Sequence, residues 1–199
     1  PPYGDDVRRA EVRSVFRRVE VCVMPNYRRM RVDGGCWFFT VNLVDRRSCL
    51  LVDRIDLLDA SIEKVRLRYP FDIDALVILP DHLHAIWTLP PGDADFSTRW
   101  RLIKTHFVKE IPATEQRSSV HVARGERAIW QRRYWEHLIA DERDWDRHVE
   151  YCYFNPVKHG LVERVEDWPH STFHRDMSDG FRPTDWSLAR DGRGSFGEE

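Results

Sequence analysis

One stretch near the middle of the chain, residues 71–89, constrains the fold most strongly. It contains two apolar runs of strand length, separated by Pro80-Asp81, which is a typical turn sequence. Two such runs joined by so short a turn predict an antiparallel hairpin. The first run alternates and then becomes wholly apolar, which is typical of a strand buried in the centre of a sheet. The sequence therefore predicts a sheet with this hairpin at its centre.

The second strand of the predicted hairpin carries two histidines, His82 and His84. Because alternate side chains of a strand point to the same face, both imidazoles should project together, about 7 Å apart at Cα. Imidazole is a common ligand of divalent metals, so the pair can share an ion. Taken alone, the pattern fits two half-buried histidines on a sheet surface better than a metal site, and a metal site needs a third ligand.

A second stretch, residues 148–160, offers that ligand. Tyr151 and Asn155 are four residues apart, which places them on one face of a helix, and Pro156 is expected to end this helix just after Asn155. The amide oxygen of Asn155 is a hard ligand for a divalent ion. A metal that also binds a phosphate oxygen would orient the phosphate beside the Tyr151 phenol, a poor nucleophile until it is activated. Alone, this stretch fits a core tyrosine and a helix-end asparagine better.

The remaining elements complete a regular order around the hairpin. Apolar periodicity and turn residues predict a strand at 37–43, a helix at 55–68, the hairpin, a helix at about 98–111, a loop at 112–128, a strand at 134–139 and the tyrosine helix at 142–155. Asp95 or Ser97 can cap the second of these helices, and Asp141 or Asp144 the third. This β-α-β-β-α-β order followed by a helix predicts a ferredoxin-like α+β sandwich.

Length and composition are those of a single globular domain. The chain has 199 residues, 42% hydrophobic and 32% charged. We expect one main domain at 24–178, an extension of unassigned role at 1–23 and a loose acidic tail at 179–199. No run of about 18 apolar residues predicts a membrane span, and the start lacks a secretory segment. The four cysteines form no CxxC pair, which favours reduced thiols and a cytoplasmic protein.

The distribution of charge is more informative than its sum. The net charge of −2 is not the bulk signature of a nucleic-acid-binding protein. Basic residues nevertheless gather at 28–31, 46–47, 99–109 and 124–133. Each group alone is more typical of a solvated face. Four such groups in a chain that also carries candidate metal ligands and Tyr151 favour contacts with phosphates.

The two stretches and several further segments, in order, resemble the REP-associated tyrosine transposases, relatives of the IS200/IS605 insertion-sequence transposases. His82-Leu83-His84 resembles the His-hydrophobic-His motif of enzymes that nick and rejoin single-stranded DNA, and Tyr151 with Asn155 resembles their one-tyrosine helix. The resembling segments are NYRR (26–29), GGCWFFTVNL (34–43), LPDHLHAIW (79–87), WQRRYWEH (130–137), YCYFNPVKHG (151–160) and WPHSTFHR (168–175). One departure is Asn155, where the wider insertion-sequence group often has Gln; the ligand atom type is the same.

The resemblance implies a ferredoxin-like fold, with the histidines on the sheet and the tyrosine helix facing them. It implies that His82, His84 and Asn155 hold Mg²⁺ or Mn²⁺, and that Tyr151 attacks single-stranded DNA to form a covalent 5′-phosphotyrosine. His137, His148 and His159 are expected to be mainly structural. The implied substrate is a repetitive extragenic palindrome, a DNA hairpin with a single-stranded 5′ guide.

The resemblance and the charge pattern together suggest DNA-contacting residues and an oligomeric state. Tyr27, Arg28 and Arg29 could read the unpaired guide by stacking and by forked hydrogen bonds. Side chains of the helix at 98–111 could follow the DNA backbone, although they suit a solvated face equally well: Arg99, Arg101 and Lys104. A monomer is expected, and a dimer that exchanges the tyrosine helix, as in insertion-sequence relatives, is the alternative.

Two other classes of function stay open at this point. A non-catalytic module could keep the fold and only bind DNA hairpins; intact His82, His84, Tyr151 and Asn155 argue against it. A metallohydrolase acting on RNA or a small phosphoester would use an activated water and would not need Tyr151. A metal-dependent covalent adduct with DNA would separate the nicking enzyme from both.

Overall fold

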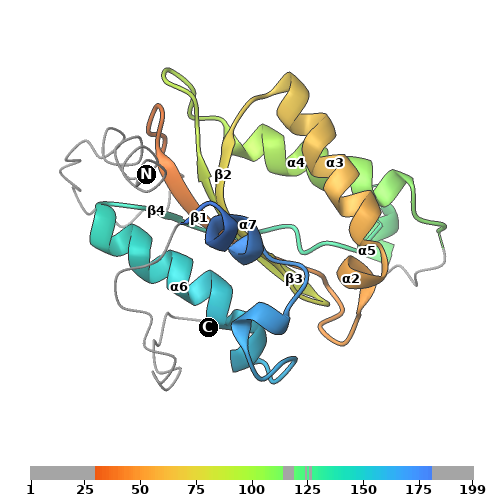
Figure 1. Cartoon of the computed structure of the whole chain (residues 1–199). Helices are drawn as coiled ribbons and strands as arrows, with labels where there is room; N and C mark the ends of the chain where they lie inside the picture. The colour runs from red at the N-terminus through yellow and green to blue at the C-terminus, as the bar shows by residue number, and fades with distance from the viewer. Residues whose placement is uncertain (1–29, 114–118, 124, 126, 181–199) are drawn as a thin grey trace.

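Figure 1 shows the computed structural model, which describes residues 30–113, 119–123, 125 and 127–180. Its elements are β1 (Cys36–Asn42), α2 (Leu50–Asp53), α3 (Ile55–Arg68), β2 (Asp72–Ile78), β3 (His82–Thr88), α4 (Phe96–Lys109), α5 (Ser119–Ala123), β4 (Trp135–Leu138), α6 (Glu142–Lys158), a 3₁₀ turn (Val165–Asp167) and α7 (Phe173–Ser178). The four strands form one antiparallel sheet in the order β2-β3-β1-β4. The ferredoxin-like α+β prediction is confirmed. Three short helices were not predicted: α2, α5 in the predicted loop, and α7 after the tyrosine helix.

The sheet separates two layers of helices, α3 and α4 on one face and α6 with α7 on the other (Figure 1). Alternate side chains of β1 and β3 enter opposite cores. Phe39 and Trp87 pack with α3 and α4, whereas Phe38 and Ile86 belong to the core under α6. Both central strands are therefore buried on both faces, which explains their nearly continuous apolar sequence.

Side-chain caps fix where the two long helices beside the sheet begin. Asp95 precedes α4 and its side chain accepts a hydrogen bond from the Thr98 backbone N–H, with 3.0 Å between the heavy atoms. Asp141 precedes α6 and accepts from the Asp144 N–H at 2.8 Å. In each case the first of the two candidate caps is the one used.

The prediction that Pro156 ends the tyrosine helix is wrong, because α6 continues to Lys158. Proline removes one backbone donor, but the next turn is still held by a bond from the His159 N–H to the Asn155 carbonyl at 3.0 Å. The chain leaves the helix after Lys158, and Gly160 follows with a φ of 67°, a left-handed conformation that glycine adopts without strain. Asn155 therefore lies within the helix and not at its end.

None of the helices that the described residues form is long and apolar enough to cross a membrane.

Candidate active site

His82 and His84 lie at the start of β3, on the face of the sheet that α6 covers. Their rings are 5.0 Å apart between centroids, and both side chains are almost completely buried. Each Nδ1 has a partner: His84 lies 2.9 Å from Thr40 Oγ1, and His82 lies 2.7 Å from Asp81 Oδ1. With Nδ1 engaged in this way, the Nε2 atom of each ring is left for another ligand.

Burial also sets the protonation of the two imidazoles. It lowers the pKa of His82, against the opposing effect of the Asp81 carboxylate. Burial lowers the pKa of His84 well below its ordinary value, and the neighbouring His82 and His159 act in the same direction. Both rings are therefore neutral at pH 7, which is the form that binds a metal.

Four buried polar atoms of three side chains have no hydrogen-bond partner among the described residues: His82 Nε2, His84 Nε2 and both amide atoms of Asn155. The Asn155 amide is close enough to His84 to influence the pKa of that ring, although it does not satisfy hydrogen-bond geometry. Leaving such atoms unpaired costs about 1–3 kcal/mol each. Two imidazole nitrogens and an amide oxygen are suitable ligands for a divalent ion, so these residues fit a metal site.

Tyr151 lies beside this group, one helical turn before Asn155. Its ring centroid is 5.0 Å from that of His84 and 5.8 Å from that of Phe38, and 9% of the residue is exposed. The Lys158 ammonium lies 5.1 Å from the centroid of the Tyr151 ring. The structure thus brings together the four residues that the sequence singled out, from one strand and one helix.

Tyr153, the other tyrosine of this helix, is occupied elsewhere. Its hydroxyl donates to the Asp176 carboxylate and lies 3.1 Å from Thr172 Oγ1, so it attaches the C-terminal segment to α6. Burial raises the pKa of the Tyr153 phenol, and the nearby Asp176 adds to this. As expected from helix geometry, Tyr153 does not share the face of Asn155.

Two residues that support the histidines were missed from the sequence, Thr40 and Asp81. Thr40 is directly opposite His84 in the β1–β3 register, a relation that only the folded sheet reveals. Asp81 directly precedes His82 in the chain, so the sequence could have suggested that its carboxylate contacts the His82 ring. Its second oxygen lies 3.1 Å from Arg46 Nε, and Arg46 also donates to Asn42 Oδ1 at 2.6 Å.

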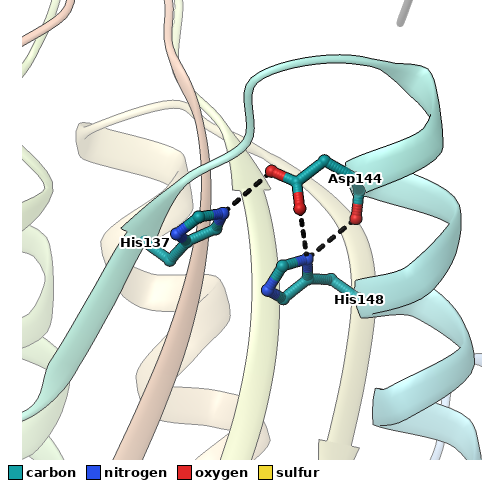
Figure 2. A group of neighbouring side chains, drawn as sticks. All are labelled: His137, Asp144 and His148. Carbon is teal, nitrogen blue, oxygen red and sulfur yellow. Dashed lines mark hydrogen bonds and ion pairs between the residues drawn. The ribbon is translucent and has the colours of Figure 1, made fainter. Parts of the chain in front are cut away.

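A second group of possible metal ligands lies where β4 meets the start of α6 (Figure 2). His137 Nε2 is 2.8 Å from one Asp144 carboxylate oxygen; His148 Nδ1 is 3.2 Å from the other and 2.8 Å from the Asp144 carbonyl. The candidate ligand atoms lie within 4.8 Å of one another. This His/Asp group has the composition of a divalent-metal site, although hydrogen bonds already join its members.

The predicted DNA-contacting residues fall in different places. Tyr27, Arg28 and Arg29 lie outside the described residues. Arg101 is exposed on α4, and the Lys104 ammonium donates to the Gln131 carbonyl at 3.0 Å. Because α4 covers the other face of the sheet, the sheet separates its side chains from the histidines and Tyr151.

For Arg99, the prediction of a surface contact is wrong. Its side chain is buried and donates hydrogen bonds to the Tyr69, Pro70 and Asp95 carbonyls and to the Asp93 carboxylate, over 2.7–3.2 Å. The guanidinium satisfies backbone acceptors where α3, β2 and the start of α4 meet, and so it is a structural group.

We therefore expect Arg99→Ala to lower the free energy of unfolding by about 3 kcal/mol, because it leaves several enclosed acceptors unpaired. Arg101→Ala is the matched control on the same helix; since Arg101 is exposed, its effect should stay within about 0.5 kcal/mol. Denaturant unfolding of both variants measures this. Equal stability of the two would show that the Arg99 hydrogen bonds contribute nothing.

Two known proteins are similar to this chain over most of its length. No protein-family model matches the chain. The REP-associated tyrosine transposase of Escherichia coli (strain K12) is 51% identical over 164 residues, which is 82% of this chain and 92% of that protein. A Haemophilus influenzae protein provisionally assigned to the same group is 43% identical over 164 residues, covering 82% of this chain and 93% of its own length.

Among solved structures, a REP-associated tyrosine transposase bound to a REP hairpin superposes with a TM-score of 0.70 at 47% sequence identity. The match covers 88% of this chain and all of that one. Fold and sequence therefore agree over nearly the whole length of the relatives. The chain belongs to the REP-associated tyrosine transposase family.

Proposed function

We propose that this protein is a metal-dependent enzyme that nicks and rejoins single-stranded DNA at REP-type hairpins through a covalent bond to Tyr151. One observation supports this most directly. Polar atoms of His82, His84 and Asn155 that have no hydrogen-bond partner within the described part of the chain lie beside a tyrosine, in the core between α6 and the sheet. A structural cluster would pair those atoms, whereas a metal site uses them.

In this proposal His82, His84 and Asn155 hold Mg²⁺ or Mn²⁺, and the Nδ1 contacts of the histidines keep Nε2 directed at the ion. When bound, the ion would polarise an oxygen of the scissile phosphate. The Tyr151 oxygen attacks phosphorus; the new Tyr–O–P bond replaces the bond to the 3′ oxygen, which leaves as a hydroxyl after taking up a proton. The Lys158 ammonium lies over the Tyr151 ring, so it brings a positive charge close to the place where the phosphate would bind.

Rejoining is the reverse of this step. A 3′-hydroxyl from another strand attacks the phosphotyrosine, and the phenol is released. Each step exchanges a phosphodiester of the DNA for the phosphotyrosine linkage, or the reverse. The energy of the bond is therefore conserved, and no nucleoside triphosphate is needed. Holding the 5′ end covalently keeps the two halves of the reaction on one protein.

The proposed substrate is a DNA hairpin with a single-stranded 5′ guide, supported by the relative that is bound to a REP hairpin. Within the chain, Tyr27, Arg28 and Arg29 remain candidates for reading the guide, and Arg101 and Lys104 for backbone contacts. We place the protein in the cytoplasm and expect it to act as a monomer. Support for the monomer is the short 139–141 link between β4 and α6, which lets the helix cover its own sheet.

The test is to incubate the protein with a labelled hairpin oligonucleotide that carries a 5′ extension, with Mn²⁺ or with EDTA. A labelled band at the mass of protein plus DNA fragment on a denaturing gel, present only with Mn²⁺, is the expected result. Tight hairpin binding without any covalent band would instead indicate the non-catalytic binding module. Cleavage without a covalent band would indicate a hydrolase that uses water.

A further inference from the structure

Trp135 is an aromatic side chain that the proposed chemistry does not use. It lies on β4, which among the described strands pairs only with β1 and so forms an edge of the four-stranded sheet. It is 47% exposed, the largest exposed fraction among the tryptophans of the described chain. An indole costs free energy when left in water, so an exposed one held in place at an edge suggests a surface for a flat ligand.

The Trp135 ring is held by its neighbours. It lies parallel to the His137 ring, with an interplanar angle of 5° and 5.7 Å between centroids, and it meets Phe38 edge-on at 5.6 Å. His137 in turn stacks on His148 at 4.7 Å. The indole therefore has a fixed orientation before any ligand arrives, which reduces the entropy lost on binding.

Asp144 holds the two histidines behind Trp135, His137 and His148, in place (Figure 2). Its carboxylate is buried and lies within hydrogen-bond distance of His137 Nε2, of His148 Nδ1 and of the Ala140 backbone N–H, which donates to it at 3.0 Å. Burial opposes ionisation, but these contacts hold the pKa of Asp144 below its ordinary value. A group this fully hydrogen-bonded is better explained as a brace for the Trp135 platform than as a second metal site.

The platform is next to the proposed reaction centre. Phe38, which Trp135 contacts, also lies 5.8 Å from Tyr151 and 5.6 Å from His84 between ring centroids. One aromatic ring thus separates the exposed indole from the proposed nucleophile. Arg132 and Arg133, both exposed, precede β4 and bring positive charge to the same edge of the sheet.

From this arrangement, and resting on the proposed function, we infer that Trp135 stacks with one unpaired base of the DNA strand close to the phosphate that Tyr151 attacks. Stacking on an aromatic side chain tolerates any base, because every base has a flat face. It would fix the strand on one side of the scissile phosphate, and the hairpin would fix the other side.

The test measures binding apart from chemistry. Every protein carries Tyr151→Phe, and EDTA is present, so that no strand is cut. Affinity is measured by fluorescence anisotropy for three kinds of DNA: the hairpin with its 5′ extension, a set in which each extension nucleotide in turn is abasic, and the blunt hairpin. The proteins are the parent, Trp135→Ala, Trp135→Phe and, as a control on the opposite face, Leu67→Ala, which removes a highly exposed apolar side chain.

Trp135→Ala is expected to weaken binding of the extended hairpin about tenfold. Trp135→Phe should recover most of that affinity, and Leu67→Ala should bind like the parent. One abasic position should weaken the parent by the same factor and leave Trp135→Ala unaffected, and the blunt hairpin should not distinguish the proteins. Thermal melting confirms that each variant is folded.

Two results would overturn the inference and leave the proposed function standing. One is equal affinity of Trp135→Ala and the parent for the extended hairpin; the other is an equal loss by Trp135→Ala on every DNA, the blunt hairpin and all abasic forms included. If the parent itself binds none of the hairpins, the proposed function fails together with the inference.

Discussion

Replacing Tyr151 with Phe is expected to lower the rate of DNA cleavage at least about 1000-fold and to abolish the covalent protein–DNA band. The substitution removes one oxygen atom, the proposed nucleophile. It keeps the ring that packs against Phe38 and His84 and lies near Lys158. Fold and hairpin affinity should therefore be retained. Single-turnover cleavage of the extended hairpin, with the denaturing gel beside it, measures the effect.

The matched control is Tyr153→Phe, the same chemical change two residues further along α6. Its hydroxyl bonds to Asp176 and Thr172 and faces away from the histidines, so this variant should lose about 1 kcal/mol of stability and keep its cleavage rate. Cleavage by Tyr151→Phe within about tenfold of the wild-type rate would rule out the tyrosine nucleophile. It would favour an activated water, and with it the metallohydrolase.

The parts of the site that could be predicted are those that depend on local periodicity. Two histidines on alternate positions of a strand must share a face, and a tyrosine four residues before an asparagine must share a helix face with it. The hairpin turn and the apolar runs fixed which elements would be central. These two relations are short-range, and the structure agrees with both of them. The meeting of the histidines with the tyrosine helix is a contact between distant segments, and it was expected from the family resemblance and not from periodicity.

What the sequence could not supply depends on contacts between distant segments. Thr40 meets His84 only because of the β1–β3 register, over a separation of 44 residues. The charge of Arg99 predicts an exposed basic side chain. The sequence does not show that the backbone carbonyls of Tyr69 and Pro70 lie close enough to accept hydrogen bonds from it in the folded protein. Pro156 was misjudged for a local reason: a proline can sit in the last turn when a glycine two or more residues later completes the helix end.

Replacing His84 with Ala is expected to lower the affinity for Mn²⁺ at least about 100-fold, because it removes one of only three proposed protein ligands. Thr40→Ala leaves every ligand in place and removes only the partner of His84 Nδ1, so a smaller loss of about tenfold is expected. Titration of the DNA-free protein with Mn²⁺ measures both affinities without relying on activity. Binding is followed by calorimetry or by the electron paramagnetic resonance signal of the free ion.

The control for this experiment is His137→Ala, which disrupts the other group of possible ligands, His137, Asp144 and His148. If the ion binds at His82, His84 and Asn155, whose polar atoms have no partner among the residues that the structure describes, this variant keeps the wild-type affinity for Mn²⁺, since the His137 ring is already paired with Asp144. The reverse pattern, with affinity lost in His137→Ala and kept in His84→Ala, would move the metal to the second group. Buried atoms without partners, and not ligand type alone, are what distinguish the two groups, and this pair of variants tests that distinction directly.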